Sequence, residues 1–212
     1  MKIFFIAVFS MLLLGSCADN TAQPNSANAL TANHHATASA EDGQQFNAQI
    51  EEWNKIFFQQ YESAQGQRSK NEMLRNINAF LIQEPNHFQA LSVRMRMLLA
   101  LKDYPAALQD LQKINQLKQD GILKLSECIL KEKLGAADAK CYQEAMAIHA
   151  IHTAHPDADL NYLLMWYMSN PAEAKVKLSA LAQEENDPLL KEHIYALLNS
   201  NRKDLVNQFF ED

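Results

Sequence analysis

Three histidines at the end of one predicted helix come closest, among the residues of this chain, to a spacing that could do chemistry. His149, His152 and His155 follow one another at intervals of three residues, so neighbours share a helical face and two of them could bind a metal ion. No Cys or Glu completes a ligand set at that spacing, and histidine near a helix C-terminus is also favoured by the helix dipole. We therefore predict a structural role for these histidines, and neither a metal site nor a cofactor.

Known enzyme signatures are missing from the sequence. It contains no G-x-S-x-G, H-E-x-x-H, C-x-x-C, Walker or dinucleotide-binding pattern, and its 5 glycines offer few places for a phosphate-binding loop. No nucleophile stands in a pattern with a general base. We expect a protein that is not an enzyme and that takes no small-molecule substrate.

The composition of the chain favours helices. Hydrophobic residues make up 48% of it, and Ala, Leu, Gln, Lys and Glu dominate, which are side chains that lose little rotamer freedom in a helix. The formal net charge of −6 is spread along the chain without a Lys/Arg-rich run, so we expect no nucleic-acid partner. The fold class that follows is all-α, with no sheet.

The first sixteen residues have the pattern of a secretion signal. Lys2 precedes an almost entirely apolar run from Ile3 to Leu14, which is too short to span a bilayer. The run ends in Leu-Gly-Ser-Cys17, which resembles the lipobox of bacterial lipoproteins. That resemblance implies cleavage after residue 16 and acylation of Cys17, and Ala18 in place of Asp implies sorting to the periplasmic face of the outer membrane. Several acyl chains together would anchor the protein stably.

A low-complexity segment follows the predicted lipidation site. Residues 18–43 carry a single aliphatic side chain larger than Ala, Leu30, and cannot bury a core. We predict a signal peptide over 1–16, the lipidated cysteine with a disordered tether over 17–44, and a folded domain over 45–212. A flexible tether of this length would span roughly 28 Å.

The folded domain is patterned for about ten short helices. Apolar residues recur at steps of three and four, beginning with Phe46, Ile50 and Trp53. Asp103, Asn170 and Asp187 each precede a proline-containing first turn, and Ser69 with Glu72 has the pattern of a capping box. Residues 162–168 are apolar on every side, which indicates either full burial or a contact patch. Short connections between such helices predict antiparallel hairpins.

A period of 34 residues divides the helical part into units at 54–87, 88–121 and 122–155. In the second unit, the large and small apolar positions of two successive helices are filled by Leu91, Met95, Leu98, Tyr104, Ala107, Leu111 and Ile114. This arrangement resembles the tetratricopeptide-repeat (TPR) family, closely over 54–155 and more loosely over 156–212. The first unit departs from the family pattern by having Lys70 and Met73 where Tyr and Ala are usual. The resemblance implies an α-solenoid of antiparallel helix pairs that acts through protein–protein contacts.

The resemblance also implies a site. In that family the first helix of each unit lines a concave groove, in which ligand peptides lie. The corresponding positions here are Lys55, Phe58, Glu62, Gln89, Ser92, Arg96, Leu99, Ser126, Leu130 and Lys133. Phe58, Leu99 and Leu130 would be anchors and Arg96 a polar clamp. In the alternative interpretation, a shifted register places the apolar ones in the core.

Two further cysteines remain once Cys17 is assigned to the lipid. Cys128 and Cys141 lie symmetrically about a turn near Leu134 and Gly135, so they stand at equal height in an antiparallel hairpin. A disulfide requires their Cα atoms within about 7 Å. In the resembled family, the closest helix approach occupies small-residue sites on or beside these two positions. An oxidising compartment favours a disulfide, and the alternative is two buried thiols that pack as small hydrophobes.

Three functions fit this address and fold. The first is a protein-binding scaffold or assembly factor, similar to the pilotins that serve a pilus, secretion or other envelope complex. The second is a periplasmic immunity or inhibitor lipoprotein that neutralises a toxin, for which the acidic chain would suit a basic partner. The third is an accessory protein of cell-wall enzymes.

Overall fold

The computed structural model describes residues 47–52, 54–55 and 64–210, and all regular structure within them is helical, without a strand. The predicted all-α fold is therefore confirmed. Residues 47–52 and 54–55 are helical, and the elements after them are α3 (Ala64–Gln83), α4 (Phe88–Ala100), α5 (Tyr104–Leu117), α6 (Gly121–Lys133), α7 (Ala139–Ala150), the 3-10 turn η1 (Pro156–Ala158), α8 (Leu160–Ser169), α9 (Pro171–Glu184), α10 (Pro188–Asn199) and α11 (Arg202–Gln208). The predicted signal peptide over 1–16 and the whole predicted tether over 17–44, Cys17 included, lie outside the described residues, as do Phe58 and Glu62.

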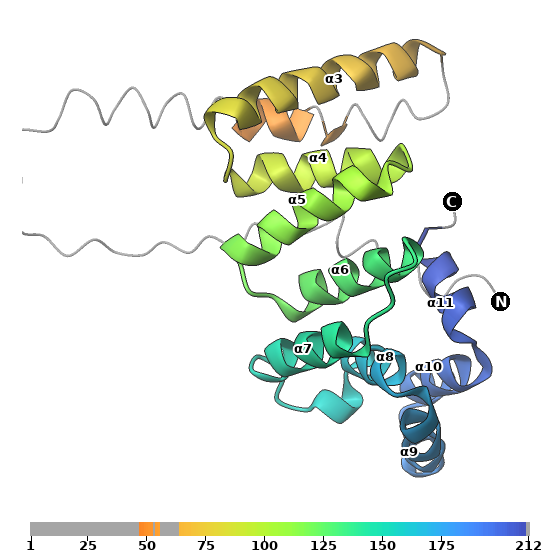
Figure 1. Ribbon diagram of the computed structural model, residues 1–212. Coiled ribbons are helices and arrows are strands. Elements are labelled where there is room, and N and C mark those ends of the chain that lie inside the picture. The colour runs from red at the N-terminus through yellow and green to blue at the C-terminus, as the bar shows by residue number, and fades with distance from the viewer. Residues whose placement is uncertain (1–46, 53, 56–63, 211–212) are drawn as a thin grey trace, which may run out of the picture.

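Successive helices pack on one another as stacked antiparallel neighbours. From α3 to α8 each helix contacts the next along the chain, and Figure 1 shows α3 to α7 as successive layers. The pairs α4–α5 and α6–α7 coincide with the predicted units at 88–121 and 122–155. After α8 the chain turns, and α11 returns to contact α6. Within the described residues, no helix has both the length and the apolar character needed to cross a membrane.

The helix starts follow the predicted caps with one exception. The carboxylate of Asp103, the amide oxygen of Asn170 and the carboxylate of Asp187 each accept a hydrogen bond from a backbone N–H in the first turn of α5, α9 and α10. The predicted capping box at Ser69 and Glu72 is wrong, because α3 already includes Ala64 and runs through both residues. Ala64, Gln65, Gln67 and Arg68 are good helix formers and outweigh Gly66, so the helix runs through the motif.

Two apolar clusters form the core. The first unites α3, α4 and α5 around residues such as Ile77, Leu91 and Ile114, and the second extends from α6 to α11. Between the helices of the first cluster, the guanidinium of Arg94 donates two hydrogen bonds to the buried carboxylate of Asp110, at 2.5 and 2.7 Å. The core therefore consists of two apolar clusters, and a charged pair links α4 to α5 within the first of them.

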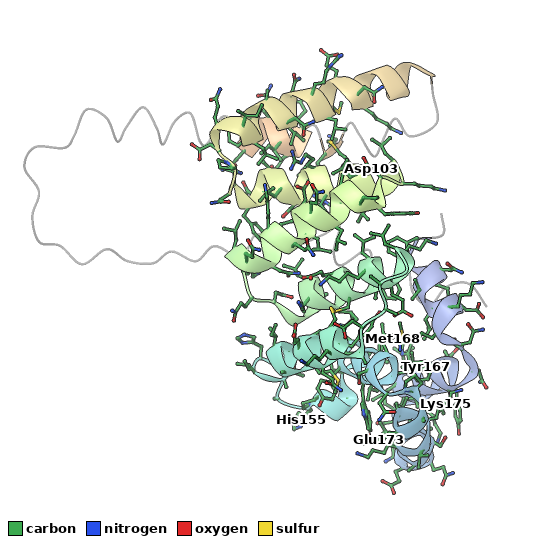
Figure 2. The ribbon with its side chains drawn as sticks, in the orientation of Figure 1. Asp103, His155, Tyr167, Met168, Glu173 and Lys175 are labelled. Atoms are coloured by element: carbon green, nitrogen blue, oxygen red, sulfur yellow. A yellow bond between two sulfur atoms is a disulfide. The ribbon has the colours of Figure 1, made fainter. Side chains whose placement is uncertain are left out.

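The apolar run at 162–168 lies inside the second cluster. Five of its residues are buried, and Tyr167 donates a hydrogen bond from its hydroxyl to the backbone oxygen of Ser200 at 2.8 Å. Figure 2 shows Tyr167 and Met168 on α8 beside α10. The run is core, and its alternative role as an exposed contact patch is excluded for these five residues.

A disulfide joins α6 to α7. Cys128 and Cys141 are bridged, with their Cα atoms 5.6 Å apart, and both are buried in the core. At the other end of the helix pair, Gly121 lets α6 approach α7 closely, because a Cβ built there would lie 2.5 Å from the Cβ of His149. Gly135, with a φ of +85°, makes the turn between the two helices. The sequence left a disulfide and two buried thiols as alternatives, and the structure contains the disulfide.

Candidate functional site

The structure places most of the predicted groove residues on partly exposed positions. Gln89, Ser92, Arg96 and Leu99 follow one face of α4 and are all half-buried, and Lys55 is exposed. The hydroxyls of Ser92 and Ser126 donate to backbone oxygens of their own helices at 2.8 and 3.0 Å. Burial lowers the pKa of Arg96. The prediction that these residues line a partner groove stays a prediction.

Leu130 is not available as an anchor. Its side chain is 1% exposed and belongs to the core cluster that α3, α4 and α5 build. It joins α6 to the preceding helix pair, as a core residue under the shifted register would. The prediction of a surface anchor at this position is therefore corrected.

The end of the predicted groove on α6 is occupied by the chain's own C-terminal segment. The ammonium of Lys133 donates to the side-chain oxygen of Asn207 at 3.0 Å and lies 5.9 and 5.5 Å from the ring centroids of Tyr104 and Phe210. The rings of Tyr104 and Phe210 pack edge to face at 5.1 Å. A partner could reach Lys133 only after displacing these contacts.

A charged contact holds α11 in that place. The guanidinium of Arg202 donates to both carboxylate oxygens of Glu132, at 2.5 and 2.9 Å, and the hydroxyl of Tyr142 donates to the same carboxylate at 2.7 Å. The hydrogen bond to Glu132 raises the pKa of Arg202, and burial above all raises that of Tyr142. This link spans α6, α7 and α11, so the C-terminal helix is held against the side of the α6–α7 pair.

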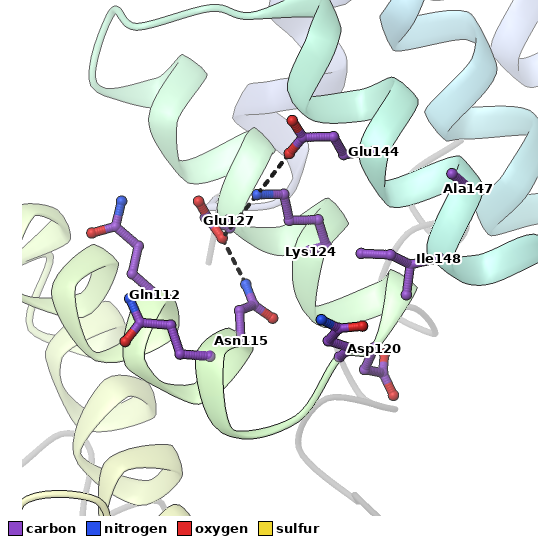
Figure 3. Close-up of a pocket in the computed structure, with 10 residues that line it drawn as sticks. Gln112, Asn115, Asp120, Lys124, Glu127, Glu144, Ala147 and Ile148 are labelled. Carbon is purple, nitrogen blue, oxygen red and sulfur yellow. Dashed lines mark hydrogen bonds and ion pairs between the residues drawn. The ribbon is translucent and has the colours of Figure 1, made fainter.

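A hollow of about 670 Å³ lies on another side of α6, between α5 and α7 (Figure 3). Lys124 lines it, and Lys124 precedes Lys133 by nine residues, which is two and a half turns, so the two side chains leave opposite sides of the helix. One wall is formed by four amide side chains from α5 and the loop after it, namely Gln112, Asn115, Gln116 and Gln119. The hollow is therefore distinct from the groove that the family resemblance implies.

The floor of the hollow is a polar network centred on Glu127. This side chain is 4% exposed, and its carboxylate accepts a hydrogen bond from Asn115 at 2.8 Å and pairs with Lys131 at 2.5 Å and Lys124 at 3.5 Å. Burial alone would raise the pKa of Glu127, but the hydrogen bonds from Lys131 and Asn115, with the charge of Lys124, lower it. Glu127 thus carries a matched negative charge that positions Lys124 and Asn115.

The opposite wall belongs to α7 and changes character along its length. The ammonium of Lys124 lies 3.2 Å from the carboxylate of Glu144, which is 58% exposed, and Ala147 and Ile148 follow one turn later. Figure 3 shows Glu144 at one end of this wall and Ile148 at the other. The hollow therefore offers amides on one side, and a carboxylate followed by an aliphatic surface on the other.

Sequence reasoning missed this hollow because each of its parts is typical of a solvent-exposed helix face. Lys124, Glu127 and Lys131 have the spacing of ordinary i, i+3 and i, i+4 ion pairs. One usable signal was the run of amides at 112, 115, 116 and 119, which is dense for one face of a single helix and the loop after it. These faces come together only in the tertiary structure, through the packing of three helices.

The three histidines do not come together as ligands. The Nε2 atom of His149 lies 3.1 Å from the carboxylate of Asp159, which caps α8. His152 and His155 lie in the segment between α7 and η1, and both are exposed. Among the described residues, no group of three or more His, Cys, Asp or Glu side chains is arranged to hold a metal ion.

Comparisons of this chain with profiles of known protein families, with curated proteins and with solved structures found no match in any of the three. The TPR resemblance therefore stays a prediction.

Proposed function

We propose that this protein is a bacterial lipoprotein, held by Cys17 at the periplasmic face of the outer membrane, whose helical stack binds another protein as a scaffold or assembly factor. The observation that carries the proposal is the open hollow on the stack between α5 and α7. Most of its residues are presented by packed helices, which suits a binding surface that is preformed.

Two features of the frame support a binding role. The Cys128–Cys141 bridge joins the floor helix of the hollow to its α7 wall, and the Arg202–Glu132 link fixes α11 on the same pair of helices. A rigid frame lowers the conformational entropy that the binding site itself loses when a partner binds. The residues available in the hollow are amides, carboxylates and one ammonium, without a paired nucleophile and base, which favours recognition over catalysis.

Site-specific photo-crosslinking in the native bacterium tests the proposal. A benzophenone amino acid is placed at Gln116 in the hollow and, as a matched control, at Gln183, which is exposed on α9. We expect a discrete protein adduct from position 116 that is absent from position 183. No adduct from position 116, nor from positions 89 and 92 on α4, would contradict the binding role.

The anchor is tested separately, because it is an independent part of the proposal. Metabolic labelling with palmitate should mark the wild-type chain, and the labelled chain should fractionate with the outer membrane. Cys17→Ser should abolish the label and remove the protein from the outer-membrane fraction. A labelled Cys17→Ser protein, or an unlabelled wild type, would contradict the lipid anchor.

A further inference from the structure

We infer that the hollow between α5 and α7 binds an extended peptide segment that carries a cationic side chain and, two residues away, an aliphatic one. The inference rests on the proposed protein-binding function and specifies what part of a partner enters this site. It concerns a different side of α6 from the groove that the sequence predicted.

The openness of the hollow indicates an elongated ligand. Gln116, Gln119, Glu144 and Ala147 all line it and are all exposed, so it is a trough and not an enclosed cavity. Small-molecule sites usually bury most of the ligand surface, which a trough of this kind does not do. A chain segment can lie along it and continue beyond both ends.

The α5 wall has the spacing of an extended backbone. Gln112 and Gln116 stand one turn apart, about 6 Å along the helix axis. Residues i and i+2 of an extended chain are separated by about 6.7 Å. Each amide has both a donor and an acceptor, so the two glutamines can pair with the N–H and C=O groups of alternate residues on one edge of a peptide.

The α7 wall has the same spacing and supplies the selectivity. Glu144 and Ile148 also stand one turn apart, and side chains i and i+2 of an extended peptide point to the same side. Glu144 shares Lys124 with Glu127 and is mostly exposed, so it can accept a second cation. Ile151, 76% exposed, continues the aliphatic surface of Ile148 by three residues.

Charge and composition disfavour other polymers. Three carboxylates and one ammonium line the hollow, and Lys118 and Lys131 beside it pair with Asp120 and Glu127. The one lining ammonium, that of Lys124, already faces Glu127 and Glu144, which disfavours nucleic acid and other polyanions. The lining residues include no aromatic side chain on which a sugar ring could stack. A peptide with a Lys or Arg fits the charge, and its neighbouring aliphatic side chain fits Ala147 and Ile148.

A positional peptide array tests the inference with the full chain purified in detergent. The probes are immobilised peptides of about nine residues in which Lys, Arg, Glu, Leu, Ile or Ser is fixed at each pair of positions. We expect the strongest binding from peptides that carry Lys or Arg and, two residues away on either side, Leu or Ile. Glu144→Lys should reverse the charge preference from Lys to Glu, and Ile148→Ser should remove the aliphatic preference, each by about tenfold.

Matched controls separate recognition from folding. Glu184→Lys, the same charge reversal on the exposed end of α9, should leave the array pattern unchanged. Circular dichroism should show equal helix content in all variants. A reversed charge preference in Glu144→Lys is an outcome that loss of structure does not produce.

Three results would overturn the inference. They are the lack of any positional preference, a Lys preference that survives in Glu144→Lys, and binding of a chitin tetrasaccharide that Gln116→Ala abolishes. A crosslink from position 116 together with a flat array would refute the peptide inference and leave the scaffold role intact. The absence of crosslinks from position 116 in the hollow and from positions 89 and 92 on α4 would refute both the peptide inference and the scaffold role.

Discussion

Reduction of the Cys128–Cys141 bridge should weaken the folded domain by an amount that the loop size determines. The two cysteines are 13 residues apart, and closing a loop of that size lowers the entropy of the unfolded chain by the equivalent of about 3 kcal/mol at 25 °C. The two sulfurs are buried, so a reductant acts mainly on the unfolded protein. For a folded domain of this length, 3 kcal/mol corresponds to a Tm lower by about 6–12 °C.

The assay is urea unfolding followed by circular dichroism, with and without a phosphine reductant. The wild-type midpoint should fall in the reduced sample, while the double variant Cys128→Ala/Cys141→Ala should have the same midpoint in both. The variant is therefore the control for any other effect of the reductant. The free energy of unfolding, and not the helix content at zero urea, is the quantity that should change.

Two results would refute this reasoning. One is a wild-type midpoint that the reductant leaves unchanged. The other is a mass spectrum of the unreduced digest in which the peptides that contain Cys128 and Cys141 are separate and carry free thiols. Either would mean that the bridge does not form in the protein or does not constrain its unfolded state.

Three further changes test other contacts of the fold. The lowered pKa of Glu127 means that its contribution to stability is present above its usual pKa of 4.5 and is lost as the pH falls through the folded value, so Glu127→Gln should flatten the acid limb of a plot of urea midpoint against pH. A Cβ at position 121 would lie 2.5 Å from that of His149, so Gly121→Ala should cost about 1–3 kcal/mol in thermal denaturation, and an unchanged Tm would argue against this close approach. Asp110→Asn removes the charge that Arg94 faces across α4 and α5, so the free energy of unfolding from urea titration should fall by about 3 kcal/mol, and an unchanged value would contradict a stabilising role for this pair.

Much of the fold could be predicted because its determinants are local. Leu91, Met95 and Leu98 mark the buried face of α4 through helical spacing alone, and all three are buried. Asp103 marks the start of α5, because its carboxylate accepts a hydrogen bond from a backbone N–H in the first turn of that helix. Repetition of such signals at a period of 34 residues was enough to predict the helix pairs.

Local rules failed where two outcomes were locally equivalent. Ser69 and Glu72 have the pattern of a capping box, yet the same residues are tolerated within a helix, and α3 runs through them. Leu130 is apolar at a position that could face either a groove or the core, and the neighbouring helix pair decided for the core. Which of the two outcomes occurs depends on the residues that pack against the position, and the pattern of a single helix does not contain that information.

The amino-acid sequence by itself determined the all-α class, the pairing of helices and the possibility of a bridge between Cys128 and Cys141, since these depend on spacing and on residues close in the chain. Only the tertiary structure decided that Arg202 meets Glu132 across 70 residues, that α11 covers Lys133, and that α5 and α7 form the walls of a hollow. The physical reason is that the free energy of such contacts depends on how helices far apart in sequence are oriented. Their orientation results from the packing of the whole core.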